Sequence, residues 1–105
     1  MSIKTRYQFI KKKYPDHLII FYEKNRYISC GVDKQILKYL NIANNTKQLE
    51  NKNINYIVFS NITINKKYEV ENNQYSYYNK LLKINNIIKH IIEEWSTIIW
   101  VLLFS

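Results

Sequence analysis

Apolar residues recur at helical spacing at the start of the chain. They are three or four positions apart, and lysines together with Arg6 occupy the opposite face. Pro15 pushes the residue before it away from helical angles and so ends the segment. The pattern predicts a basic amphipathic helix over residues 3–14. Its apolar positions are Ile3, Tyr7, Ile10 and Tyr14.

Short runs of β-branched and aromatic residues follow and predict strands. Residues 18–22 and 54–59 read as buried core strands. Residues 27–30 are expected to pair with the first strand as a hairpin, after a polar turn at residues 23–26. Residues 62–64 and 67–70 indicate a further strand pair, so the sheet should hold four or more strands.

Three more segments complete the expected order of elements. Asp33 is a plausible N-cap of a helix that ends near Asn41, and Gly31 before it can take a positive φ without cost. Residues 44–53 are polar and are assigned to an exposed loop. Residues 74–94 return to helical spacing, which predicts either a helix broken at Asn85-Asn86 and followed by a strand, or one continuous helix.

Asparagine is the expected turn-forming residue, because the chain has only one glycine and one proline. A short polar side chain tolerates the left-handed conformation better than most. We therefore expect loop tips at Asn44-Asn45, Asn72-Asn73 and Asn85-Asn86. Together the elements predict an α/β fold with a mixed β-sheet flanked by helices and one small core.

The last eleven residues, 95–105, are almost wholly apolar. A membrane-spanning helix needs about 20 such residues, so this tail is expected to pack in a core or against a partner. The chain thus divides into a domain over residues 1–94 and an apolar tail over residues 95–105.

The formal net charge of +8 and the pI near 9.5 favour an acidic partner such as the phosphate backbone or an anionic membrane surface. A second explanation stays open. Asparagine, isoleucine, lysine and tyrosine dominate the sequence, and all four have AT-rich codons, so genome composition accounts for part of the basicity.

The sequence gives little support for a catalytic site or a metal-binding site. Cys30 has no second cysteine to pair with, and His17 and His90 lack metal-ligand spacing. Glu93-Glu94 reads as an exposed pair, and no glycine-rich phosphate loop is present. We expect a protein without enzyme activity, cofactor, metal or small-molecule substrate. The lone cysteine and the charged amino terminus predict an intracellular, reducing location, cytoplasm or nucleoid.

A motif in residues 14–34 resembles the amino-terminal mismatch-recognition domain of the MutS family of DNA repair proteins. The family pattern is close to Y-P-D-x-I-L-L-F-x-x-G-D-F-Y-E-x-F-G-E-D-A, and this chain reads YPDHLIIFYEKNRYISCGVDK without a gap. Weaker matches follow in the same order at residues 39–42, 78–82 and 90–94. The resemblance covers roughly residues 3–94 and implies the MutS amino-terminal fold.

In that family a phenylalanine of the F-Y-E motif wedges beside a mispaired base and the glutamate hydrogen-bonds it. Here Arg26 stands at the phenylalanine position, Tyr27 matches the tyrosine, and Ile28 replaces the glutamate. A one-residue shift would place Tyr27 at the wedge and Ser29 at the glutamate. No alignment restores the carboxylate. The resemblance therefore implies a module that binds duplex or mismatched DNA with a degenerate mismatch-reading motif and without the family's ATPase.

The candidate DNA-binding residues lie in two groups. Arg26, Tyr27 and Lys24 would contact DNA at a kinked step, whereas Lys11, Lys12 and Lys13 would neutralise phosphates. The alternatives are a solvated turn and a solvated helix face. Expected partners are DNA and either the rest of a MutS-like subunit or a second copy of the chain.

Two other functions stay open beside DNA binding. One is a structural or interaction protein that docks through its apolar tail on a partner or a membrane surface. The other is a decayed fragment without activity.

Overall fold

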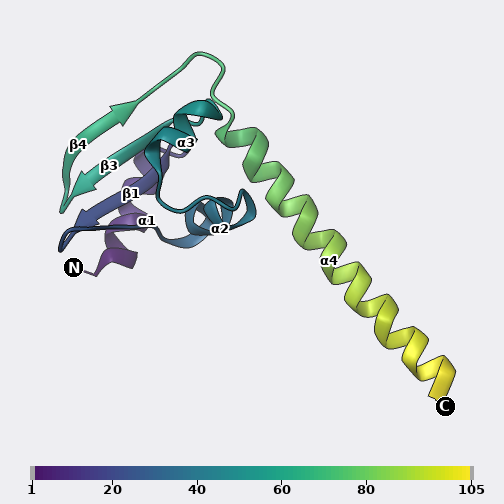
Figure 1. Ribbon diagram of the computed structural model, residues 1–105. Helices are drawn as coiled ribbons and strands as arrows, with labels where there is room; N and C mark the ends of the chain where they lie inside the picture. Colours follow the sequence, from purple (N-terminus) through teal and green to yellow (C-terminus); the bar gives the residue numbers. More distant parts are fainter. Residues whose placement is uncertain (1, 105) are drawn as a thin grey trace.

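The computed structural model describes residues 2–104, which form a four-stranded mixed sheet with helices on both faces (Figure 1). The strand order β2-β1-β3-β4 places the parallel pair β1 and β3 at the centre and one antiparallel neighbour at each edge. This arrangement confirms the expected α/β class and the minimum of four strands. The elements are α1 (Ile3–Lys13), β1 (Leu18–Glu23), β2 (Arg26–Ile28), α2 (Gly31–Tyr39), α3 (Thr46–Asn51), β3 (Tyr56–Ser60), β4 (Thr63–Tyr68) and α4 (Tyr75–Phe104).

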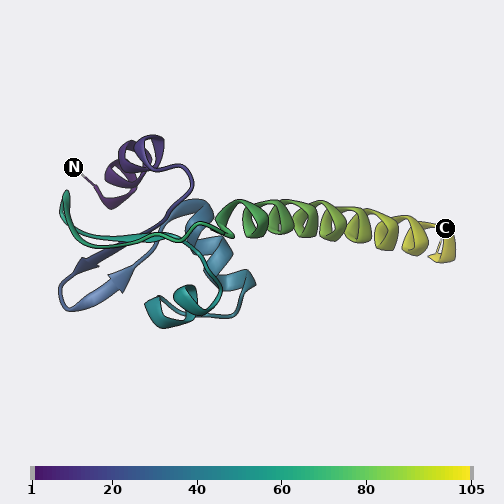
Figure 2. The same cartoon turned by 90° about the horizontal axis from the view of Figure 1, so that it is seen from above.

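Each central strand contributes side chains to two separate hydrophobic cores, because successive side chains in a strand point to opposite faces. Leu18 and Ile20 of β1 pack under α2, α3 and the start of α4, while Ile19 and Phe21 pack under α1. Viewed from above, α1 lies on one side of the sheet and α2 and α3 on the other (Figure 2). The three layers explain why β1 and β3 are continuous apolar runs: both of their faces are covered.

The β1–β2 hairpin turns through Lys24 and Asn25, at φ values of 52° and 62°. Two successive positive φ angles in a two-residue loop match the right-handed twist of the flanking strands. Asparagine also takes positive φ at Asn41, Asn53 and Asn61. Asparagine therefore supplies much of the turn chemistry, as expected, although Asn85-Asn86 lies inside a helix and not at a loop tip.

The sheet has short or charged edges. β2 contains only three residues, and the outer edge β4 carries Lys66 and Lys67. β4 is one strand with a register shift opposite Val58 and Phe59, so the expected strand pair at residues 62–64 and 67–70 is wrong. The irregularity absorbs one extra residue without ending the strand.

Two helix boundaries differ from expectation. α2 begins at Gly31 with Cys30 as its N-cap, so Asp33 is not a cap but a buried residue of the first turn. Gly31 has φ +53°, and a β-carbon there would approach the Tyr7 ring to 2.8 Å, so both backbone and packing require glycine. Residues 46–51 form α3, capped by Asn45, and not the open loop predicted for residues 44–53.

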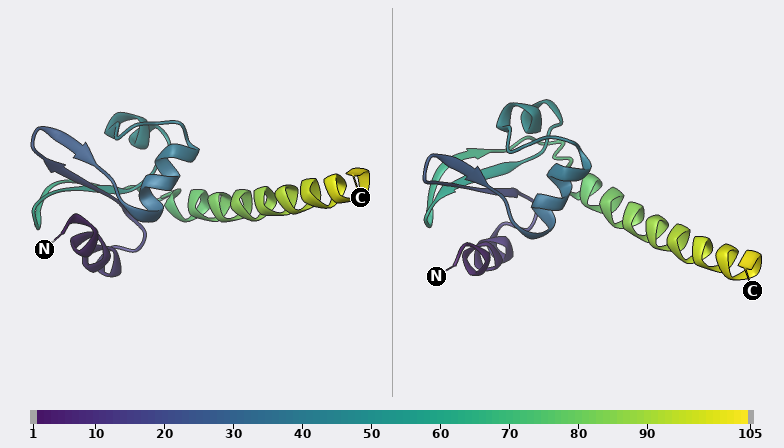
Figure 3. Two further views of the ribbon diagram at one scale, coloured as in Figure 1. Left: turned by 90° about the horizontal axis from the view of Figure 1, so that it is seen from below. Right: turned by 60° about the horizontal axis from the view of Figure 1, so that its bottom comes forward.

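Helix α4 runs without a break through Asn85-Asn86 and across the expected domain boundary after residue 94. The continuous-helix alternative is confirmed, and the predicted strand at 87–92 is wrong. The first turns of α4 pack against α2 through the side chains of Tyr75 and Leu82. The rest of the helix projects away from the domain (Figure 3), and every described residue from 83 onward is exposed. The molecule therefore measures 59 × 33 × 24 Å. No helix within residues 2–104 combines the length and the apolar character needed to cross a membrane.

Candidate functional site

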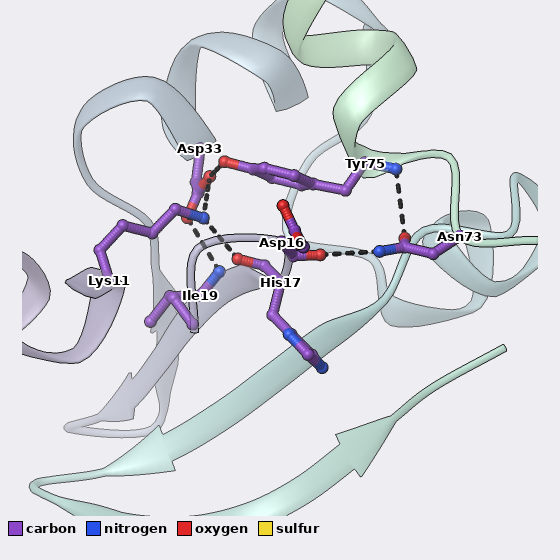
Figure 4. Close-up of polar contacts among 7 residues, drawn as sticks. All are labelled: Lys11, Asp16, His17, Ile19, Asp33, Asn73 and Tyr75. Carbon is purple, nitrogen blue, oxygen red and sulfur yellow. Dashed lines mark hydrogen bonds and ion pairs between the residues drawn. The ribbon is translucent and has the colours of Figure 1, made fainter. Parts of the chain in front are cut away.

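The polar centre of the domain is the fully buried carboxylate of Asp33 (Figure 4). Its Oδ1 accepts a hydrogen bond from the Tyr75 hydroxyl at 2.5 Å, and its Oδ2 accepts one from the Ile19 backbone N–H at 3.0 Å. The Lys11 ammonium lies 3.1 Å from both oxygens. These three donors come from α4, β1 and α1, so one carboxylate on α2 ties four elements together.

Burial dominates the titration of this cluster. Desolvation lowers the pKa of Lys11 below its usual value, despite the opposing attraction of Asp33. Desolvation also raises the pKa values of Tyr7 and Tyr75, and the negative charge of Asp33 adds to both shifts. At neutral pH both phenols keep their protons, and the Tyr75 hydroxyl serves as a hydrogen-bond donor to Asp33.

A second polar residue extends the cluster toward the start of α4. The Asn73 amide donates to the Asp16 carbonyl at 2.8 Å, and its oxygen accepts from the backbone N–H groups of Asn55 and Tyr75. His17 lies beside it with both ring nitrogens buried and without a hydrogen bond. Burial lowers the pKa of His17, and Glu69 at 3.7 Å opposes that shift only in part.

The tip of the β1–β2 hairpin lies at the carboxyl end of β1, whereas Asp33 lies at its amino end. Lys24 and Arg26 are exposed, and within the described part of the chain neither forms an ion pair. Tyr27 is 48% exposed and packs against Tyr22 at a ring-centroid distance of 4.9 Å. The Asn44 amide donates to the Tyr27 carbonyl at 3.1 Å, which fixes the loop before α3 beside β2.

Arg6 braces this end of the sheet from beneath. Its guanidinium forms a 2.5 Å ion pair with Glu23 at the end of β1 and donates to the Asn61 carbonyl in the β3–β4 turn at 3.1 Å. Because β1 and β3 are parallel, both turns lie at their carboxyl ends, and one buried arginine joins them. Hydrogen bonding from Arg6 lowers the pKa of Glu23. Arg6 therefore ties the end of β1, directly before the tip, to the β3–β4 turn.

No family model, curated protein or solved structure matches this chain. The similarity to the MutS amino-terminal domain consequently rests on the sequence motifs alone, chiefly the one in residues 14–34, and the function that it implies stays a prediction.

The structure separates the two groups of candidate DNA-binding residues. Lys11 is the least available, because its side chain is 17% exposed and its ammonium is held by Asp33 and the His17 carbonyl. Lys12 and Lys13 are exposed at the end of α1, near the amino end of β1. β1 has six residues, so these lysines and the hairpin tip lie about 20 Å apart, measured along the strand.

The residue at the family's glutamate position also has a defined place. Ile28 is half-buried and packs against the core under α1, with Phe21 as its partner across the hairpin. Its neighbours Arg26 and Tyr27 point to opposite faces of β2 and line a surface depression with residues 43–46. The tip therefore presents a cation and an aromatic ring, and the nearby carboxylate of Glu23 is paired with Arg6.

Sequence reasoning did not identify the structural roles of Asp33 and Arg6. The expectation that Arg6 lies with the lysines opposite the apolar face of α1 is wrong, because Arg6 is 7% exposed and lies on the face that α1 turns toward the sheet. The available signal was its spacing, three residues after Ile3 and four before Ile10, which places it beside the apolar stripe. Among residues 2–104, no group of three or more histidine, cysteine, aspartate or glutamate side chains could hold a metal ion.

Proposed function

We propose that this protein is a non-catalytic DNA-binding module that contacts duplex DNA with the tip of its β1–β2 hairpin. The observation that carries the proposal is the exposed pair Lys24 and Arg26, both without carboxylate partners in the described chain, beside the half-exposed ring of Tyr27. Cations of this kind neutralise phosphates or enter a narrow minor groove, and an aromatic ring at a base step favours sites where stacking is already weak.

The charge distribution of the domain supports an anionic partner. Four carboxylates, Glu23, Asp33, Glu50 and Glu69, are each paired with a lysine or arginine. The positive excess therefore resides on side chains that have no internal partner, including those of the tip. The tie that Arg6 makes at the end of β1 also suits DNA contact, since it reduces the ordering that binding would require there.

The module is expected to distinguish mismatched from matched duplexes weakly. Ile28 faces the core and cannot accept or donate a hydrogen bond, so no residue replaces the base-reading carboxylate of the motif it resembles. Affinity would come from phosphate contacts and from insertion of Tyr27, and neither reads a base edge.

Fluorescence anisotropy with matched and mismatched duplexes tests this proposal. We expect salt-dependent binding to both, with similar affinities. The double variant Lys24→Ala/Arg26→Ala should bind more weakly and lower the slope of log K against log salt by about 1 for each phosphate contact removed. Lys38→Ala, an exposed lysine on α2, is the matched control and should change the affinity less. Absence of salt-dependent binding, or equal losses in the tip and control variants, would refute the proposal.

A further inference from the structure

The free part of α4 carries an unbroken alternation of apolar residues at steps of three and four. This spacing produces a continuous seam along one side of a helix, as in coiled coils. From Ile84 onward the seam residues are between 46% and 60% exposed. The seam residues are Leu81, Ile84, Ile88, Ile91, Trp95 and Ile98.

The domain leaves this seam uncovered. Tyr75 and Leu82, which bury α4 against α2, are seven residues apart and lie on a different side of the helix. Polar side chains such as Lys83, Lys89 and Glu93 occupy the side of α4 away from the seam, whereas Ile87 and Ile92, both 59% exposed, flank it and widen it. An apolar stripe of this kind on an exposed helix marks an interaction surface.

We propose that the occupant of this seam is α4 of a second copy of the chain, packed antiparallel. In that register Ile84 of one copy meets Ile88 of the other at the centre, and the two-fold axis repeats the contact. Lys80 and Glu94 flank the same side of the seam, and they are 14 residues, or about 21 Å, apart on one helix, so they cannot pair with each other within one copy. Within its own helix Glu94 contacts His90, whose Nε2 lies 3.0 Å from its Oε1. Across the antiparallel pair, Lys80 of each copy lies opposite Glu94 of the other.

Charge complementarity selects this arrangement over the others. Sliding one helix by one heptad toward the helix end would place Glu94 opposite Ile87 and Lys80 opposite Val101, without an ion pair, and sliding by two heptads would bring the two copies of Glu94 together, which is repulsive. A parallel pair would place Lys80 beside Asn85 and Glu94 beside Ile99, without any ion pair. An anionic membrane surface is disfavoured because Glu93 and Glu94 directly precede Trp95 and would be carried to the lipid headgroups.

Sedimentation equilibrium on the full chain tests the proposal without DNA, so its outcome is independent of the DNA-binding proposal. We expect a mass of two copies, twice 12.8 kDa. Glu94→Lys and Lys80→Glu should each raise the dimer dissociation constant about tenfold or more, because two attractive pairs become repulsive. The double exchange Lys80→Glu/Glu94→Lys should restore dimerisation.

Lys83→Glu makes the same charge change outside the seam and should leave the dimer intact. Circular dichroism checks that each variant keeps its helix. A single-chain mass for the native protein, or failure of the double exchange to restore dimerisation, would overturn the antiparallel pairing. Sedimentation of a monomer with vesicles of anionic lipid would also overturn it and would assign the seam to a membrane surface.

Discussion

Replacement of Asp33 by asparagine should remove a large part of the stability of this domain. Asparagine has the shape of aspartate but no charge, so the Lys11 ammonium would lose its ion pair with Asp33 at a side chain that is 17% exposed. Breaking one side of a buried ion pair costs about 3–5 kcal/mol, because the other charge stays buried. The remaining solvent contact of Lys11 and its hydrogen bond to the His17 carbonyl place the expected loss near the lower end, about 3 kcal/mol.

Such a loss is large beside the total stability of a small domain, about 5–15 kcal/mol. Urea unfolding followed by circular dichroism measures it, and the melting temperature should fall by on the order of 15 °C. Lys12→Met, one residue along α1 and fully in solvent, is the matched control and should change the free energy of unfolding by less than about 0.5 kcal/mol.

A double-mutant cycle with Lys11→Met sharpens the test. The variant Lys11→Met/Asp33→Asn leaves no unpaired charge, so its cost should be smaller than the sum of the two single costs. If Asp33→Asn costs as little as the Lys12 control, or if the two single effects add, then the carboxylate is not the tie that the hydrogen-bond pattern indicates.

Three further changes probe other parts of the fold. Gly31→Ala should lower the free energy of unfolding by at least about 1 kcal/mol, since it places a β-carbon at positive φ and 2.8 Å from the Tyr7 ring; an unchanged urea midpoint would contradict this. Leu49→Ala should cost about 2–5 kcal/mol because Leu49 is fully buried, and a loss below about 1 kcal/mol would mean that α3 does not dock as described. Burial lowers the pKa of His17 in the folded chain, so the unfolded chain binds its proton first and stability is lost as pH falls below about 6.5. His17→Gln should therefore flatten the decline in stability between pH 7 and pH 5, and an unaltered pH profile would exclude His17 as its source.

The central strands were predictable from the sequence because their chemistry is local. Residues 18–22 are an unbroken apolar run, and residues 54–59 are β-branched and aromatic except for Asn55, which is the composition of a strand covered on both faces. The amphipathic pattern of residues 3–14 and the stop at Pro15 likewise determine α1. The hairpin turn follows from polar residues between two such runs.

The errors arose where tertiary contacts outweigh local preference. Residues 46–51 are polar and lack a helical stripe, yet Leu49 alone anchors α3 in the core, and Asn45 caps it. Asn85-Asn86 is a poor helix sequence, but the isoleucines and leucines on either side favour one continuous helix over a turn. Asp33 resembles an N-cap, whereas its partners Lys11 and Tyr75 lie 22 and 42 residues away in sequence, and no local pattern reveals such contacts.

The candidate site was predictable in composition but not in arrangement. The motif in residues 14–34 identified Arg26 and Tyr27, and the structure exposes both. The sequence did not show how far this group lies from the second group, Lys11, Lys12 and Lys13. β1 runs away from the end of α1, so the lysines lie near one end of the strand and the hairpin tip at the other.

The two edges of the sheet limit how copies of this protein can associate. An open edge strand with free N–H and C=O groups invites another strand to pair with it and can lead to aggregation. Here β2 offers only three residues, and an incoming strand at β4 would have to approach Lys66 and Lys67. Growth of the sheet by strand addition is thus discouraged at both sides, which disfavours open-ended fibres built from stacked sheets.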